Sequence, residues 1–247
     1  MWGSAVVYSG VIIAAVGAGL FLKPIPWLRV STRARALALA AGGGLLAGIG
    51  LLLPVSESRL SQAETRLDDF APVWHFREVH SIRIAAPPVQ VFEAIRRVRA
   101  DEILLFRTLT WIRRAGRPLP PGILNAGDRE SLIDVATRSG FVRLVDDAPR
   151  ELVIGAIVVA PPGARVPVSA DVFRLPLPPG FALATMNFVV TPDGSDGSRV
   201  STETRVFANS HSARRRFAAY WRIIYPGSAL IRRMWLRAIQ RRATAGM

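Results

Sequence analysis

The sequence predicts an α+β fold, in which an antiparallel sheet packs on a long C-terminal helix, preceded by a transmembrane hairpin of two helices. Three observations predict it. Two apolar runs without charged residues open the chain, at 5–22 and 36–53. Segments of alternating apolar and polar residues follow, and one long amphipathic stretch, 217–239, closes the chain. Because a curved sheet must bury one face, this stretch is the apolar stripe available to cover it.

Each apolar run is long enough, at ~1.5 Å per helical residue, to cross most of the ~30 Å hydrocarbon layer. The first acidic residue is Glu57. A cleaved secretory signal peptide is the rival explanation of the first run. However, residues 1–4 carry no positive side chain, and Lys23-Pro24 follows the run in place of a small-x-small cleavage site. We therefore expect two retained spans.

Small residues recur along both runs. Gly44 and Gly48 have the GxxxG spacing that lets helices approach closely, and Gly10, Ala14 and Ala18 recur every four residues in the first run. This pattern predicts an intramolecular hairpin packed through small residues. A homodimer interface is the weaker alternative, and the oligomeric state is not predicted.

The net charge of +14 is unevenly distributed over the 247 residues. Residues 1–53 carry +4, residues 54–210 carry +1, and the chain from residue 211 onward carries +9, all from arginine. A pI near 11.6 is typical of nucleic-acid-binding proteins. Because the charge sits in the hairpin loop and the last helix, the distribution favours contact with membrane lipid, and we expect no nucleic-acid partner.

The orientation follows from the positive charges close to the spans. The loop 23–35 carries four, against Arg59, Arg66 and the N-terminal amine on the other side. This count predicts a multi-pass protein of the cell membrane with a cytoplasmic loop and an extracytoplasmic large domain. The basic last helix argues the other way, because anionic lipid is concentrated in cytoplasmic leaflets. Trp27 and its neighbouring prolines predict an interfacial turn in the loop.

The domain boundaries follow composition: a hairpin at 1–55, a linker or juxtamembrane helix at 56–73, and a globular domain at 74–247. Within the last, alternation predicts strands at 74–84 and 199–208, and further strand candidates lie at 141–146, 151–159 and 181–191. Amphipathic spacing predicts helices at 89–98 and, with Asp101 as N-cap, at 102–114. Segment 160–180 is proline-rich loop with at most a short edge strand.

The chain ends in a helix capped by Ser210 or Ser212, in which Pro226-Gly227 predicts a kink or a short break. Arginines project opposite its apolar stripe and are expected at the membrane surface: Arg214, Arg215, Arg222, Arg232, Arg233 and Arg237.

The sequence lacks the residues or motifs that several kinds of chemistry require. Cysteine is absent, which excludes a disulfide framework, a thiolate metal site and a cysteine nucleophile. There is no GxSxG, Walker-type or GxGxxG motif. The histidines are His75, His80 and His211, and the first two fall on opposite faces of one strand. We expect no metal site and no cofactor.

Two segments carry a resemblance to a known family. They are HSIRIAAPPVQVFEAIRRV, residues 80–98, and RVSTETRVFANSHSARRRFAAYWRIIYPGSALIRRMWLRAI, residues 199–239. With the order of elements over 74–243, they resemble the helix-grip domains of the SRPBCC superfamily, which includes START-like and polyketide cyclase-like proteins. The resemblance implies a sheet curled around its last helix, with a mostly apolar cavity between them. The hairpin departs from the usual soluble member.

The resemblance implies non-covalent binding of a hydrophobic small molecule or lipid by a membrane-anchored domain. Residues expected to line the cavity are Phe76, Glu78, His80, Phe106, Trp111, Phe188, Phe217, Trp221 and Ile224. The first alternative is a cyclase-like or hydrolase-like enzyme that uses Glu78 and His80 for acid–base chemistry. The second is a scaffold that contacts anionic lipid or protein through its basic last helix.

Both polar residues also have a structural interpretation. Glu78 and His80 would then pair with arginines near the sheet edge, and Glu203 would form a salt bridge with Arg205 two residues along the same strand face. Whether the space between sheet and helix is filled or hollow cannot be read from the sequence.

Overall fold

The structure is a computed structural model that describes residues 2–23, 25, 30, 32–120, 122–166 and 169–245, so the turn expected at Trp27 lies outside it. Its α-helices are α1 (Trp2–Leu22), α2 (Arg33–Leu52), α3 (Pro88–Arg97), α4 (Phe106–Arg113), α5 (Leu132–Arg138) and α6 (His211–Thr244). Its strands are β1 (Ser58–Arg59), β2 (Val73–Trp74), β3 (Phe76–Ile84), β4 (Phe141–Asp147), β5 (Glu151–Val159), β6 (Ala182–Pro192) and β7 (Ser198–Ala208). Its 3-10 helices are η2 (Arg66–Asp69), η3 (Ala100–Glu102), η4 (Ile123–Asn125) and η5 (Ala170–Phe173).

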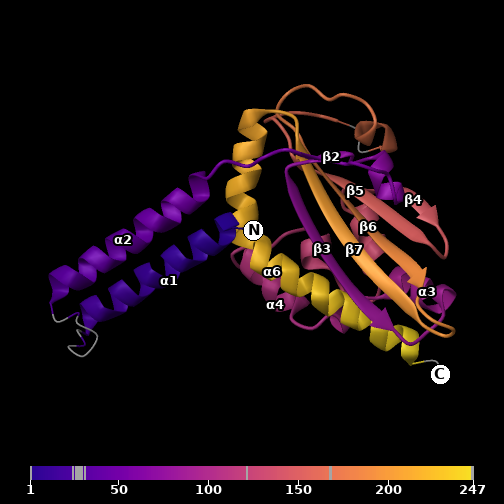
Figure 1. Ribbon diagram of the computed structural model, residues 1–247, viewed down its shortest axis with the longest axis horizontal. Coiled ribbons are helices and arrows are strands. Elements are labelled where there is room, and N and C mark those ends of the chain that lie inside the picture. The colour runs from indigo at the N-terminus through magenta and orange to yellow at the C-terminus, as the bar shows by residue number, and fades with distance from the viewer. Residues whose placement is uncertain are drawn as a thin grey trace. The chain divides into compact units, whose positions relative to one another are not determined.

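The chain divides into two compact units. The hairpin unit comprises residues 1–55 and 215–226, and the sheet unit comprises residues 56–214 and 227–247. Helix α6 therefore contributes residues 215–226 to the hairpin unit and the rest of its length to the sheet unit. The predicted α+β class is confirmed: a five-stranded antiparallel sheet packs on the C-terminal helix, and two apolar helices forming a hairpin precede it (Figure 1).

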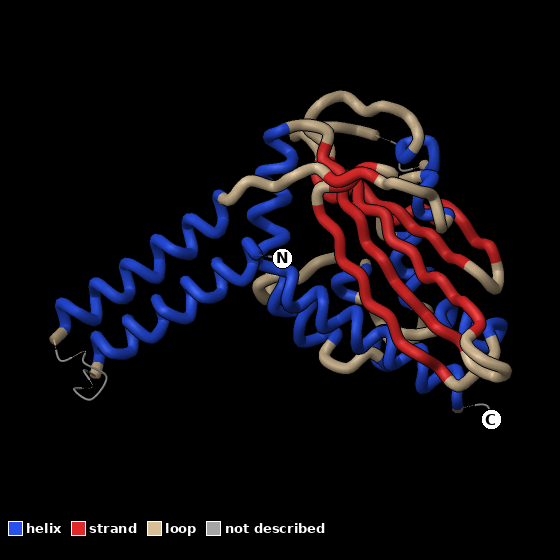
Figure 2. Tube along the Cα trace, in the orientation of Figure 1, coloured by secondary structure: helices blue, strands red, loops and turns tan. Residues whose placement is uncertain are grey.

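Helices α1 and α2 run side by side as an antiparallel pair (Figure 2). Both are long and apolar enough to cross a membrane. Only 22 % and 17 % of the residues in their most apolar windows are buried. Their surface is therefore apolar and exposed, with Ile12, Val16, Leu37 and Leu45 pointing outward, unlike the core helix of a water-soluble protein.

The two helices meet through glycines, but not through the predicted pair. A Cβ on Gly10 would lie 2.4 Å from the Ala47 nitrogen, and one on Gly43 would lie 2.3 Å from the Ala14 nitrogen. In contrast, a Cβ on Gly44 or Gly48 would meet nothing within 4 Å among the described residues. The prediction of small-residue packing is confirmed for Gly10 and Ala14 of α1 and wrong for Gly44 and Gly48 of α2. The seam repeats every seven residues, through Gly10 and Gly17 of α1 and Gly43 and Gly50 of α2, as helices crossing at a shallow angle require.

The main sheet has the strand order β3-β7-β6-β5-β4, with every neighbouring pair antiparallel. The expected strand segments all form, with bounds that shift by at most two residues. Strand β3 buries Phe76, Glu78 and Ile84, whereas Arg77 and Val79 between them are exposed. The alternation read from the sequence thus separates an inner face, which carries Glu78, from an outer face.

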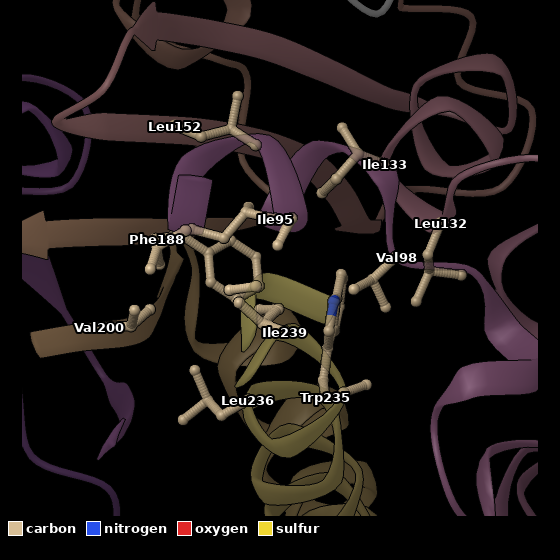
Figure 3. Close-up of a cluster of buried hydrophobic side chains, with 14 of the residues drawn as sticks. Ile95, Val98, Leu132, Ile133, Leu152, Phe188, Val200, Trp235, Leu236 and Ile239 are labelled. Atoms are coloured by element: carbon tan, nitrogen blue, oxygen red, sulfur yellow. The ribbon is translucent and has the colours of Figure 1, made fainter. Parts of the chain in front are cut away.

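The inner face is covered at one end by a closely packed core. Phe188 of β6 and Leu152 of β5 meet Ile95 of α3 and Trp235 and Ile239 of α6 (Figure 3). All five are at most 3 % exposed, and the rings of Phe188 and Trp235 meet edge-on with centroids 5.1 Å apart. The space between the sheet and the second half of α6 is therefore filled at this end.

Part of the outer face is covered by residues 56–73, here called the strap. A two-stranded ladder of β1 and β2 and the 3-10 helix η2 stand where a linker or a juxtamembrane helix was expected. Leu67 and Phe70 of the strap pack with Val153 and Phe173 in a second core. The carboxylate of Glu151 on β5 accepts hydrogen bonds from the backbone nitrogens of strap residues 66 and 67 at 2.7 and 3.1 Å.

Three local expectations need correction. Asp101 does not cap the second helix, because it lies within η3, and α4 begins only at Phe106 after Leu105 in a left-handed conformation (φ 62°). Helix α5 was not predicted. Helix α6 is capped by Ser210, one of the two expected caps, and stays helical through Pro226. Of the two alternatives expected at Pro226, the short break is therefore wrong and the kink stays a prediction.

Candidate ligand-binding site

A polar cluster interrupts the apolar inner face of the sheet. Glu78 is 4 % exposed, and its Oε1 lies 2.8 Å from Nε2 of His80, two residues along β3. The hydroxyl of Ser228 on α6 donates to Oε2 of Glu78 at 3.0 Å. Both carboxylate oxygens are therefore held by neighbours in the same unit, one on the sheet and one on the helix.

Arg232 lies one helical turn beyond Ser228 and brings a positive charge to this cluster. Its guanidinium contacts Sδ of Met186 and lies 5.5 Å from the centre of the Trp235 ring. Burial lowers the pKa of Arg232 to about 10, although the charge of Glu78 acts to raise it. The side chain is therefore still protonated at neutral pH, and it offsets the charge of the buried carboxylate.

This geometry ties the sheet to the last helix. Glu78 and His80 contact each other and Ser228 rather than arginines at the sheet edge, and the nearby arginine comes from α6. A carboxylate that accepts two hydrogen bonds and faces a cation resembles a structural network more closely than a general base awaiting a substrate.

A groove opens on another part of the sheet unit, between α4 and the segment around η4. Its volume is about 590 Å³, within the range of small-molecule sites. The residues that line it are Phe106, Arg107, Thr108, Thr110, Trp111, Arg114, Leu124, Asn125, Ala126 and Gly127. Apolar rings and polar side chains therefore share one concave surface.

Two features of the groove suit an amphipathic ligand. Trp111 is 54 % exposed, so its indole ring is available to cover an apolar body. Arg114 donates from Nη1 to the carbonyl oxygen of Arg117 at 2.7 Å, but its buried Nε has no hydrogen-bond partner among the described residues. A buried donor without a partner is rare in proteins, and Nε itself is inaccessible. The guanidinium nevertheless places a positive charge in the lining of the groove.

The expected cavity residues are distributed over several places. Phe106 and Trp111 line the groove, Phe188 fills the core, and Glu78 and His80 form the polar cluster. Phe76 is buried on the inner face of β3. The remaining three, Phe217, Trp221 and Ile224, belong to the hairpin unit. The described residues therefore do not show one cavity that contains all nine.

The arginines predicted at the membrane surface fall into two groups. Arg215, Arg233 and Arg237 are exposed. The other three make contacts within the protein: Nη1 of Arg214 lies 3.2 Å from Nε2 of His75, Arg222 is buried in the hairpin unit, and Arg232 faces the polar cluster. The apolar stripe predicted which side of α6 is buried. It did not predict that arginines beside the stripe would contact the hairpin unit in one part of the helix and the sheet unit in the rest.

The groove residues of η4 had no signal in the sequence. The segment 123–127 contains neither a motif nor a periodic pattern, and it meets Phe106 and Trp111 only because the chain folds back. The unpredicted α5 did have a signal: the Ser131 hydroxyl accepts from the Asp134 nitrogen at 3.1 Å, a recognisable N-cap, and Gly140 follows the helix with φ 102°.

Comparison with known proteins adds little to this description. No protein-family model and no curated protein sequence matches the chain. Among solved structures, TTHA0849 from Thermus thermophilus is similar over 69 % of this chain and 99 % of that protein, with 12 % sequence identity and a TM-score of 0.28. At that score the likeness carries no argument about function. The α+β architecture rests on the helices and strands described above.

Proposed function

We propose that this chain is a membrane-anchored, START-like protein that binds a hydrophobic small molecule or lipid without covalent chemistry. The observation that carries the proposal is the groove beside α4, where apolar rings adjoin the positively charged side chain of Arg114. A ligand with an apolar body and an acidic head would cover Trp111 and place its head near that charge.

The anchor is supported by the exposed apolar surface of both N-terminal helices. Within the hairpin unit, the hydroxyl of Tyr8 on α1 donates to the carbonyl oxygen of Ile223 at 2.5 Å. This hydrogen bond would join α1 to the last helix in a mature chain that keeps α1.

Trp111→Ala is expected to weaken ligand binding about tenfold or more, because burying a large apolar side chain contributes ~1.5–3 kcal/mol. The measurement is native mass spectrometry of the full-length protein in detergent, titrated with oleate as the probe. Ile112→Ala is the matched control, since Ile112 is the next residue of α4, is 59 % exposed and does not line the groove. Equal oleate affinity in both variants would rule out the groove as the site.

We further propose that the sheet unit is extracytoplasmic, from the positive charges of the hairpin loop. Because the chain has no cysteine, Ser195→Cys in the exposed β6–β7 turn supplies a single thiol. A membrane-impermeant maleimide should label it in intact cells and should label Val30→Cys, in the loop, only after permeabilisation. The opposite pattern would place the sheet unit in the cytoplasm.

A further inference from the structure

Helix α6 is shared between the two units, and its first half has a composition unlike that of a core helix. Residues 215–226 cluster with the hairpin. They include aromatic, aliphatic and basic residues and no acid, in the order RRFAAYWRIIYP. Helices that lie in the plane of a membrane surface have this combination.

Arg222 joins this segment to the end of α2. Its guanidinium donates to the carbonyl oxygen of Leu51 and, at 2.5 Å, to that of Leu53. These are among the last carbonyls of α2, which no further turn of that helix can satisfy. Since an unsatisfied carbonyl costs several kcal/mol in hydrocarbon and an arginine can reach water from a membrane boundary, this contact suits the edge of a bilayer.

The other spanning helix contacts the same segment. A Cβ on Gly3 of α1 would lie 2.6 Å from Nε of Arg222, so the arginine side chain packs directly against the start of α1. Five residues along, Tyr8 donates to the carbonyl of Ile223. Pro226 lacks the N–H that the carbonyl of Arg222 would otherwise accept, which loosens the helix at this point. Residues 215–226 are thus held by both apolar helices.

The outward side of the segment carries a stripe at helical spacing. Arg216, Tyr220 and Ile223 are all exposed, with Ile223 at 54 %, and Arg215 flanks them. Trp2, next to Gly3 in the chain, is 86 % exposed. Tyrosine and tryptophan are enriched where a protein crosses the membrane–water boundary, and arginine there contacts lipid phosphates.

We propose that residues 215–226 form a third membrane-contacting element, which lies in the bilayer interface and binds anionic head groups through Arg215 and Arg216. The proposal rests on the membrane anchor proposed above and extends it. It assigns Arg222 a different role, as an internal cap of α2. The same helix then enters the sheet unit at Gly227, one residue before Ser228, whose hydroxyl binds Glu78.

The test uses the absence of cysteine, which allows single spin labels on the full chain. The labelled variants are Ile223→Cys in the segment, Leu45→Cys on the outward face of α2, and Arg237→Cys on the second half of α6. Each is reconstituted in vesicles of phosphatidylcholine mixed with phosphatidylglycerol. Collision rates with oxygen, which partitions into lipid, and with a water-soluble nickel complex report the depth of each label.

The label at residue 223 should collide with oxygen more often, and with nickel less often, than the label at residue 237. Both of its rates should lie between those at residues 45 and 237. A water-like label at residue 223 with a lipid-like label at residue 45 would overturn the in-plane element while leaving the anchor standing. Water-like values at both would refute the anchor as well.

A charge test separates specific head-group contacts from general attraction. The double variant Arg215→Gln/Arg216→Gln should retain roughly 25-fold less phosphatidylglycerol in native mass spectra, because each arginine near an anionic surface contributes about fivefold to the binding. The matched control is Arg233→Gln/Arg237→Gln, which removes equal charge from exposed positions of the same helix in the other unit. An equal loss in both pairs, or no loss in the first, would contradict the proposal.

Discussion

Phe188→Ala is expected to lower the free energy of unfolding of the sheet unit by ~3–5 kcal/mol. Phe188 is 1 % exposed, and its ring fills the space between the sheet and Trp235 of α6. Protein interiors are closely packed, so the neighbours can collapse only partly into the space left by the ring. A loss of this size is a large share of the ~5–15 kcal/mol that holds a typical domain together. Thermal unfolding of the full chain in mild detergent, followed by tryptophan fluorescence, measures it.

The control is Val79→Ala on the outer side of β3, where the side chain is 45 % exposed. Its expected cost is below ~0.5 kcal/mol, as for most surface substitutions. If Phe188→Ala were equally mild, the ring would border an empty cavity and not a core. The pair of variants therefore decides whether the space is filled or hollow, a question that the resemblance to helix-grip domains leaves open.

Local patterns were sufficient to predict most of the elements. Strand β5 was predicted at its observed bounds, Glu151–Val159, and its first six residues are all buried, so both of its faces are covered. Helix α3 followed from its amphipathic spacing and the prolines that begin it. The salt bridge expected between Glu203 and Arg205 is present, at 2.5 Å, since both side chains project from one face of β7.

What could not be predicted depends on contacts between distant parts of the chain. Amphipathic spacing shows which side of a helix is buried, but not what buries it. The stripe on α6 keeps its phase across Pro226, so nothing in the pattern indicated that residues 215–226 would cluster with the hairpin. The same limit applies to the hairpin seam, where several glycines have similar spacing and only packing selects Gly43 over Gly44.

The strap shows this limit most clearly. Its sequence is polar with scattered leucines. Its conformation depends on contacts with residues far along the chain. Asp68 of the strap binds Arg205, 137 positions away, at 2.6 Å, and both side chains are at most 5 % exposed. The same guanidinium donates to the carbonyl of Ala71 at 2.9 Å and lies 4.3 Å from the centre of the Trp74 ring. A buried ion pair with these additional partners holds the strap on the sheet.

Asp68→Asn is therefore expected to cost ~3 kcal/mol at neutral pH, because it leaves the buried Arg205 with less compensating charge. Asp193→Asn is the matched control: Asp193 pairs with Arg83 and Arg199 in exposed positions, where solvent screens the interaction, and it should have a much smaller effect. Similar losses in the two variants would show that the strap is held by its apolar contacts alone. Urea unfolding in detergent measures both.

The same substitution should also change the response to acid. Burial acts to raise the pKa of Asp68, but hydrogen bonds from the backbone of Glu64 and Thr65 and from Arg205 outweigh it and hold the pKa below its usual value of 3.8. The native carboxylate thus binds protons more weakly than the unfolded chain does, so its stabilisation is complete above about pH 4 and is lost as the pH falls through the lower native pKa. The difference in unfolding free energy between the natural protein and Asp68→Asn should therefore be constant from pH 7 to about pH 5 and shrink below about pH 4. A difference that stayed constant in acid would mean that the carboxylate charge of Asp68 contributes nothing to holding the strap.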